Sequence, residues 1–199
     1  YSAHRHYSST TYLVSGRKIM EYNLNSLLQI ISVRLAVYLE TILPSLYDEW
    51  WKQAVVDNLS FQQRQRMEQR NINSLGALDL AALLRVLDQN WYQISNKLNL
   101  PSETRHFVKE MQTIRNRWAH TSTEGISVDD TYRDLDTLQR FAVTIQADDD
   151  LIQEIRKTKK ILLAGEMRPL SQNITIDTPS LQNAEKDSED GVSNGDRRC

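Results

Sequence analysis

One short run of the sequence carries side-chain types suited to phosphodiester chemistry: Arg115-Asn116-Arg117-Trp118-Ala119-His120, at the C-terminal end of a predicted helix. An imidazole exchanges a proton near neutral pH, and a guanidinium binds phosphate charge without losing its own proton. No other segment offers a comparable reactive set. The functional prediction therefore depends on whether this run is a site or an ordinary surface.

Helical geometry places the members of this run differently. At about 100° per residue, Asn116 and His120 share the side opposite the apolar stripe, and Arg115 flanks that stripe. A solvated histidine that favours the negative end of the helix dipole is the ordinary alternative for His120. Arg115 and His120 are about 500° apart and point in different directions. Fraying of the last turn or a second copy must bring them together, and a two-fold dimer would place two such sets in one groove.

Other candidates have simpler explanations. Basic residues at 64–70 could contact phosphate, although a solvated helix face explains them equally well. We predict that Arg64, Arg66 and Arg117 bind RNA. Trp91 and Trp118 continue apolar stripes, which favours core packing over base stacking. The histidines at 4, 6 and 106 lack acidic or cysteine partners at ligand spacing, so we expect no metal site and no cofactor. Phosphate-binding loop, dinucleotide and serine-hydrolase motifs do not occur in the sequence.

Composition indicates one domain with two tails among 199 residues. We expect a flexible segment at 1–19, a helical domain at 20–163 and a disordered tail at 164–199, because both ends lack a sustained apolar pattern. Residues 1–147 carry 16 basic and 15 acidic residues, and the remainder carries 8 and 11. This balance excludes a globally basic nucleic-acid binder, so any attraction for RNA must come from a local patch.

The cellular setting is predicted from cysteine and hydropathy patterns. The single cysteine, Cys199, excludes an internal disulfide and a cysteine metal site, which favours a reducing cytoplasm. Arg34, Glu40 and Pro44 interrupt the longest apolar run, so no membrane-spanning helix is expected. The first residues lack the apolar core of a signal peptide.

The fold class follows from apolar spacing of three and four residues along most of the chain. Helices are predicted from about residue 24 to 42, 47 to 55, 61 to 70, 80 to 98, 101 to 118, 127 to 145 and 149 to 163. Ser60 with Gln63 and Ser127 with Asp130 form capping boxes, and Asp79 can cap the helix that follows it. We predict an all-α bundle of about five main helices.

Three segments together carry a family resemblance. They are Asp79-Leu80-Ala81-Ala82-Leu83-Leu84 reaching to Trp91, Val108-Lys109-Glu110 leading to the Arg115–His120 run, and the stretch from Ser127 to Asp136. The combination resembles the HEPN superfamily, in the subgroup named after a yeast transcription-associated PIN endoribonuclease. Ribonucleases of this superfamily carry an arginine, a polar residue directly after it, and a histidine four to six residues after the arginine. Arg115, Asn116 and His120 fill those places.

The resemblance implies a helical domain that dimerises, with the motif at the dimer cleft, and metal-independent RNA cleavage in active members. His120 would transfer protons, Arg115 would stabilise phosphate charge, and Asn116 would orient His120 or the RNA. Bacterial members of the subgroup often lie at the N-terminus of large proteins, including defence-related ATPases. The resemblance therefore implies a toxin-like role and a fused or associated ATPase or nuclease. The alternative is a non-catalytic dimerisation or partner-binding module of a larger defence or RNA-processing protein.

Overall fold

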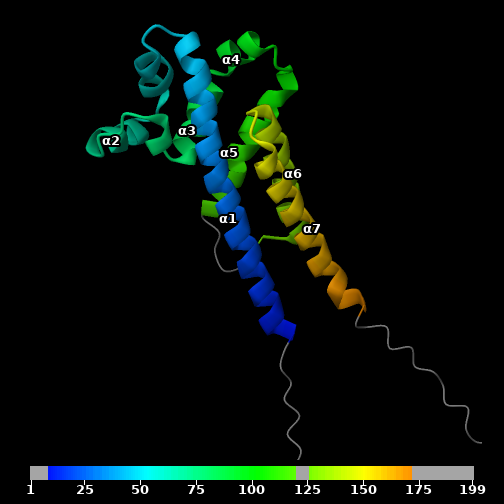
Figure 1. Cartoon of the computed structure of the whole chain (residues 1–199). Coiled ribbons are helices and arrows are strands. Elements are labelled where there is room, and N and C mark those ends of the chain that lie inside the picture. The colour runs from blue at the N-terminus through cyan, green and yellow to red at the C-terminus, as the bar shows by residue number, and fades with distance from the viewer. Residues whose placement is uncertain (1–8, 120–125, 172–199) are drawn as a thin grey trace, which may run out of the picture.

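The computed structural model of the chain describes residues 9–119 and 126–171, and the side chains of residues 23–119 and 126–164. In those residues it is all-α, without a strand (Figure 1), which confirms the predicted fold class. The α-helices are α1 (Ser9–Ile42), α2 (Phe61–Gln69), α3 (Leu80–Gln89), α4 (Trp91–Leu98), α5 (Arg105–Ala119), α6 (Val128–Thr144) and α7 (Asp149–Ser171). Short 3-10 helices lie at Leu43–Ser45, Val56–Asn58, Leu75–Ala77 and Ser102–Thr104, and a π-helical turn lies at Trp51–Val55.

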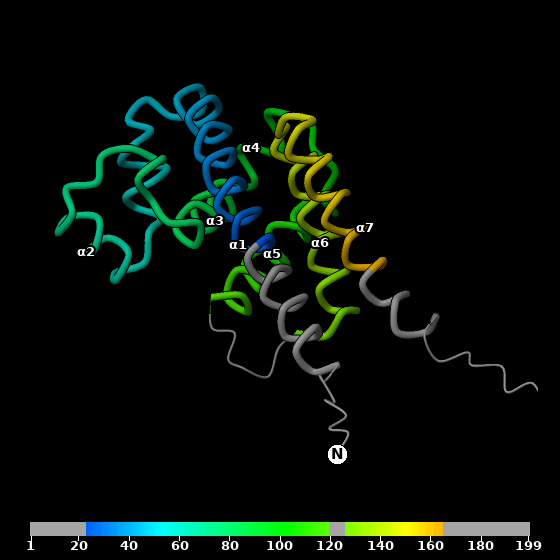
Figure 2. Tube along the Cα trace, turned by 60° about the horizontal axis from the view of Figure 1, so that its bottom comes forward, coloured from blue at the N-terminus to red at the C-terminus, as the bar shows by residue number. Residues whose placement is uncertain are grey.

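Five long helices enclose one core. Helix α1 packs against α3 and α7, α5 packs against α3 and α6, and α6 packs against α7, so the five helices close a ring (Figure 2). Each contributes fully buried side chains from its apolar stripe, such as Leu35, Leu84, Met111, Phe141 and Ile155. Burying one such side chain stabilises the fold by roughly 1.5–3 kcal/mol. The core therefore holds α5, which carries the candidate motif, on two sides.

The predicted starts of α2, α3 and α6 are confirmed by their caps, whereas the helix predicted from about residue 101 begins at Arg105. The Ser60 hydroxyl accepts a hydrogen bond from the Gln63 amide at 3.3 Å, and the Gln63 side chain accepts one from the Ser60 amide at 3.0 Å. Asp79 accepts from the Ala82 amide at 2.8 Å, and Ser127 accepts from the Asp130 amide at 3.0 Å. These caps satisfy amide groups that a helix start leaves without partners.

The helix predicted at 80–98 is divided at Asn90, which the sequence pattern did not indicate. Asn90 is buried, and its amide nitrogen donates to the carbonyl oxygens of Ala54 at 2.9 Å and Val86 at 2.7 Å. Its side-chain oxygen accepts from the Tyr47 hydroxyl at 2.7 Å. These bonds tie the junction of α3 and α4 to the segment after α1. Non-local partners thus explain a break that apolar periodicity alone does not show.

Two helices extend beyond the residue range predicted for the helical domain. Helix α1 begins at Ser9, inside the segment expected to be flexible, and α7 continues to Ser171, inside the segment expected to be disordered. Both helices extend past the rest of the bundle (Figure 1). Because each continues a helix already nucleated in the bundle, it needs no new nucleation. Residues 1–8 and 172–199 lie outside the described part of the chain.

One segment has the length and mean hydropathy of a membrane span, by length and composition alone. It is Asn23–Ser45, with a mean hydropathy of 1.5. Half of this segment is buried inside the bundle, where Leu24, Ile31 and Leu39 are fully covered. The interrupting charge of Arg34 lies at the surface, where it pairs with Asp148 at the start of α7. A core-facing role therefore accounts for much of the apolar composition of α1.

Candidate functional site

Helix α5 positions most of the candidate motif. Val108, Met111, Ile114 and Trp118 are buried on its inner face, as their spacing predicts. Arg115 is half-buried at the edge of that face, and Asn116 is exposed. The predicted orientation of these two side chains is therefore confirmed. His120 follows the last residue of α5 and lies outside the described residues, so its predicted position remains a prediction.

Arg115 and Asn116 interact directly. The Arg115 Nη1 atom donates a hydrogen bond to Asn116 Oδ1 at 3.2 Å. This bond uses one of the five N–H donors of the guanidinium. It holds a permanent cation near the end of α5, four residues before the helix ends at Ala119. A cation in this position is suited to binding a phosphate group.

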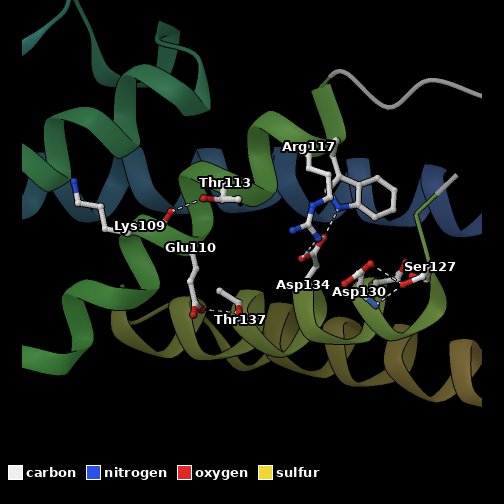
Figure 3. Close-up of polar contacts among 10 residues, drawn as sticks. Lys109, Glu110, Thr113, Arg117, Ser127, Asp130, Asp134 and Thr137 are labelled. Carbon is white, nitrogen blue, oxygen red and sulfur yellow. Dashed lines mark hydrogen bonds and ion pairs between the residues drawn. The ribbon is translucent and has the colours of Figure 1, made fainter. Parts of the chain in front are cut away.

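The C-terminal end of α5 is held by a buried carboxylate on α6. Arg117 Nη1 donates to both Asp134 oxygens, at 2.9 and 3.1 Å, and Trp118 Nε1 donates to Asp134 Oδ2 at 2.8 Å (Figure 3). Asp134 is only 4% exposed. Burial raises the pKa of Asp134, more than the hydrogen bond from Trp118 and the charge of Arg117 lower it. We call Arg117, Trp118 and Asp134 the C-terminal anchor.

A second buried carboxylate holds the beginning of the same helix. Asp88 on α3 is 5% exposed and accepts from Arg105 Nε at 3.2 Å and from Lys109 Nζ at 2.5 Å. We call Asp88, Arg105 and Lys109 the N-terminal anchor. Sequence analysis missed both anchors. The sequence did contain an indication of them, because each aspartate shares a helix face with the apolar stripe. Asp88 follows Leu84 by four residues, and Asp134 precedes Leu138 by four.

A small cavity of about 210 Å³ lies between α5 and α6, beside the C-terminal anchor. Its lining consists of Glu110, Thr113, Ile114, Arg117, Arg133, Asp134 and Thr137. The Thr137 hydroxyl donates to Glu110 Oε2 at 2.9 Å across this space (Figure 3). Its volume is below the roughly 300–1,000 Å³ of typical small-molecule sites, so we assign it no ligand.

Two of the three predicted RNA-binding residues are not brought to the end of α5. Arg64 and Arg66 lie on α2, which stands to one side of the bundle in both views (Figures 1 and 2). Arg66 is exposed, and Arg64 Nη2 donates to the Leu59 carbonyl oxygen at 3.5 Å. Arg117, the third, belongs to the C-terminal anchor. Their predicted contact with RNA remains a prediction.

The tryptophans and histidines add little to the site. Trp91 and Trp118 are buried, as predicted for core residues. Trp50 and Trp51 are half-buried and meet edge to face, with ring centroids 5.6 Å apart. Within the part of the chain that the structure describes, no three histidine, cysteine or acidic side chains converge on a metal position.

The comparison with family models identifies the family of the chain. The model of the Swt1-like HEPN family matches residues 26–146. The chain belongs to the Swt1-like HEPN family. The match contains α2 to α6 entirely, with both anchors and the Arg115–His120 run, and it ends before α7. HEPN domains commonly bind RNA and dimerise. No curated protein and no solved structure matches the chain significantly.

Proposed function

We propose that this HEPN domain is a metal-independent endoribonuclease that uses Arg115, Asn116 and His120 at a cleft between two copies of the chain. The observation that supports it most is the Arg115–Asn116 hydrogen bond at the outer surface of a helix end that is anchored to the bundle. The family match over the same residues adds to this support. Two copies provide two Arg-His sets for one phosphodiester.

The proposed chemistry is a transfer within the RNA strand. The ribose 2′-oxygen attacks the neighbouring phosphorus, and the bond from phosphorus to the 5′-oxygen breaks. His120 accepts the proton of the 2′-hydroxyl or supplies a proton to the leaving 5′-oxygen. Arg115 stabilises the charge that accumulates on the phosphate oxygens, and Asn116 holds the guanidinium in place. Such proton transfer contributes typically about 10²–10⁴-fold, and placed charge donors contribute on a similar scale.

The test is cleavage of a fluorescently labelled RNA with EDTA present throughout. We expect His120→Ala and Arg115→Ala to reduce the cleavage rate by about 10²-fold or more. His106→Ala is the matched control, because His106 is an exposed histidine on the same helix, outside the motif. The proposal is wrong if His120→Ala cleaves RNA as fast as the unmodified chain.

A second function, as a non-catalytic dimerisation or partner-binding module, is favoured by the arginine contacts. Two of the three arginines predicted to bind RNA have protein partners, since Arg64 contacts the Leu59 carbonyl and Arg117 pairs with Asp134. The near-neutral charge of the chain also gives little attraction for RNA. A chain that dimerises in sedimentation experiments without cleaving any RNA would favour this function.

A further inference from the structure

We propose that Asp134 is a positioning residue for Arg115 and Asn116 of the Arg115–His120 run, an inference that rests on the proposed function. Its carboxylate binds the two residues in the middle of that run, Arg117 and Trp118. Arg117 thereby serves to orient the motif and is not primarily an RNA ligand. Asp134 itself is buried between α5 and α6, so it acts through Arg117 and Trp118.

Two adjacent contacts constrain the helix more than one contact does. Arg117 and Trp118 leave α5 about 100° apart around its axis. Because one carboxylate binds both, it fixes the rotation of the helix end as well as its distance from α6. The direction in which Arg115 and Asn116 point depends on that rotation. A rotated helix end would turn the Arg115 guanidinium away from a phosphate held at the cleft.

The anchor acts where a helix is least stable by itself. The last four carbonyl groups of an α-helix lack intrahelical partners, and helix ends open more easily than helix centres. Helix α5 ends at Ala119, only one residue beyond Trp118 and directly before His120. The C-terminal anchor is therefore the last described tertiary connection before the histidine. Its loss would loosen the turn that carries Arg115 and Asn116.

The N-terminal anchor provides a matched control on the same helix. Asp88 is buried to the same degree as Asp134 and also accepts from two residues of α5. Its partners, Arg105 and Lys109, lie in the first two turns and outside the motif. Removing the charge of Asp88 weakens the contacts of the first two turns of α5 but leaves the contacts of Arg117 and Trp118 in place. The pair of variants therefore separates positioning from general stabilisation.

The first experiment compares Asp134→Asn with Asp88→Asn in the full chain. Asparagine keeps an oxygen acceptor and a similar volume but removes the charge. We expect Asp134→Asn to lower kcat for RNA cleavage by about 10- to 10²-fold with little change in KM, since small displacements of catalytic groups have effects of this size. We expect Asp88→Asn to leave kcat within about 3-fold. Equal kcat losses in both variants, or none in Asp134→Asn, would overturn the inference.

The second measurement does not depend on activity. Backbone amide hydrogen exchange reports the opening of the last turn of α5, residues 115–119. We expect exchange there to accelerate at least 10-fold in Asp134→Asn and to stay unchanged in Asp88→Asn. If Asp134→Asn does not fold, Trp118→Phe serves instead, because it removes one donor and keeps an aromatic ring. Unchanged exchange in this region overturns the inference. Accelerated exchange in a chain that never cleaves RNA overturns only the proposed function.

Discussion

The two ends of α5 are held by similar chemistry in different surroundings. At the N-terminal anchor, Asp88 meets two cations whose side chains are about half-exposed, so water can solvate them if the pairing is lost. At the C-terminal anchor, Asp134 binds Arg117 and the buried indole N–H of Trp118. A buried donor that loses its acceptor destabilises the fold more than an exposed one does. The end that carries the motif is therefore the more sensitive end.

The largest loss of stability is expected from a substitution at Met111, which lies between the two anchors. Met111 is fully buried in the middle of α5. Met111→Ala should reduce the free energy of unfolding by about 2–5 kcal/mol, because it leaves a cavity in the core. Urea denaturation measures this change. Amide hydrogen exchange should accelerate at both ends of α5 together. Acceleration at one end only would show that the two anchors do not depend on the same core packing.

The features that the sequence could predict are those with local causes. The apolar face of α5 follows from spacing within the helix, and the caps of α2, α3 and α6 at Ser60, Asp79 and Ser127 bind amides three residues away. The outward direction of Asn116 follows from the same periodicity. Each of these features requires only the identity of near neighbours, and each is confirmed.

The parts that sequence could not predict depend on contacts between distant residues. Asp88 binds residues that follow it by 17 and 21 positions, on another helix. Asp134 binds residues that precede it by 16 and 17 positions, also on another helix. Asn90 reaches Tyr47, 43 residues away. Such pairs depend on how the helices meet, which periodicity does not encode. Arg117 illustrates the consequence, because its ion pair with Asp134 on α6 cannot be inferred from the residues beside it in the sequence.

Replacing each anchor carboxylate by alanine should have a smaller effect on the free energy of unfolding, and the effect should differ between the two anchors. Asp134→Ala should lower the free energy of unfolding by about 2–3 kcal/mol, because it leaves the Trp118 N–H buried without an acceptor. Asp88→Ala should lower it by about 1–2 kcal/mol, because Arg105 and Lys109 can regain water. Urea denaturation of both variants at neutral pH gives the comparison. A larger loss for Asp88→Ala would contradict the view that the motif end is the more sensitive one.

The smallest effect concerns pH and contrasts Asp134 with Asp136, two residues along α6. Burial raises the pKa of Asp134 in the folded chain. Asp134 therefore contributes stability that is complete below the unfolded carboxyl pKa of about 3.9 and is lost as the pH rises through its raised folded value. The hydrogen bond from Lys159 lowers the pKa of Asp136. Asp136 contributes stability above pH of about 3.9 that is lost as the pH falls through its lowered folded value.

Urea denaturation of Asp134→Asn and Asp136→Asn across this range measures both signs. As the pH falls toward about 4, the stability of the unmodified chain should rise relative to Asp134→Asn, because only the unmodified chain gains from protonation of Asp134. Below about pH 4 its advantage over Asp136→Asn should shrink, because protonation ends the bonds that Asp136 accepts from Lys159 and Arg140. Parallel curves for the two variants would mean that burial does not dominate at Asp134, and the C-terminal anchor would then be an ordinary surface-type ion pair.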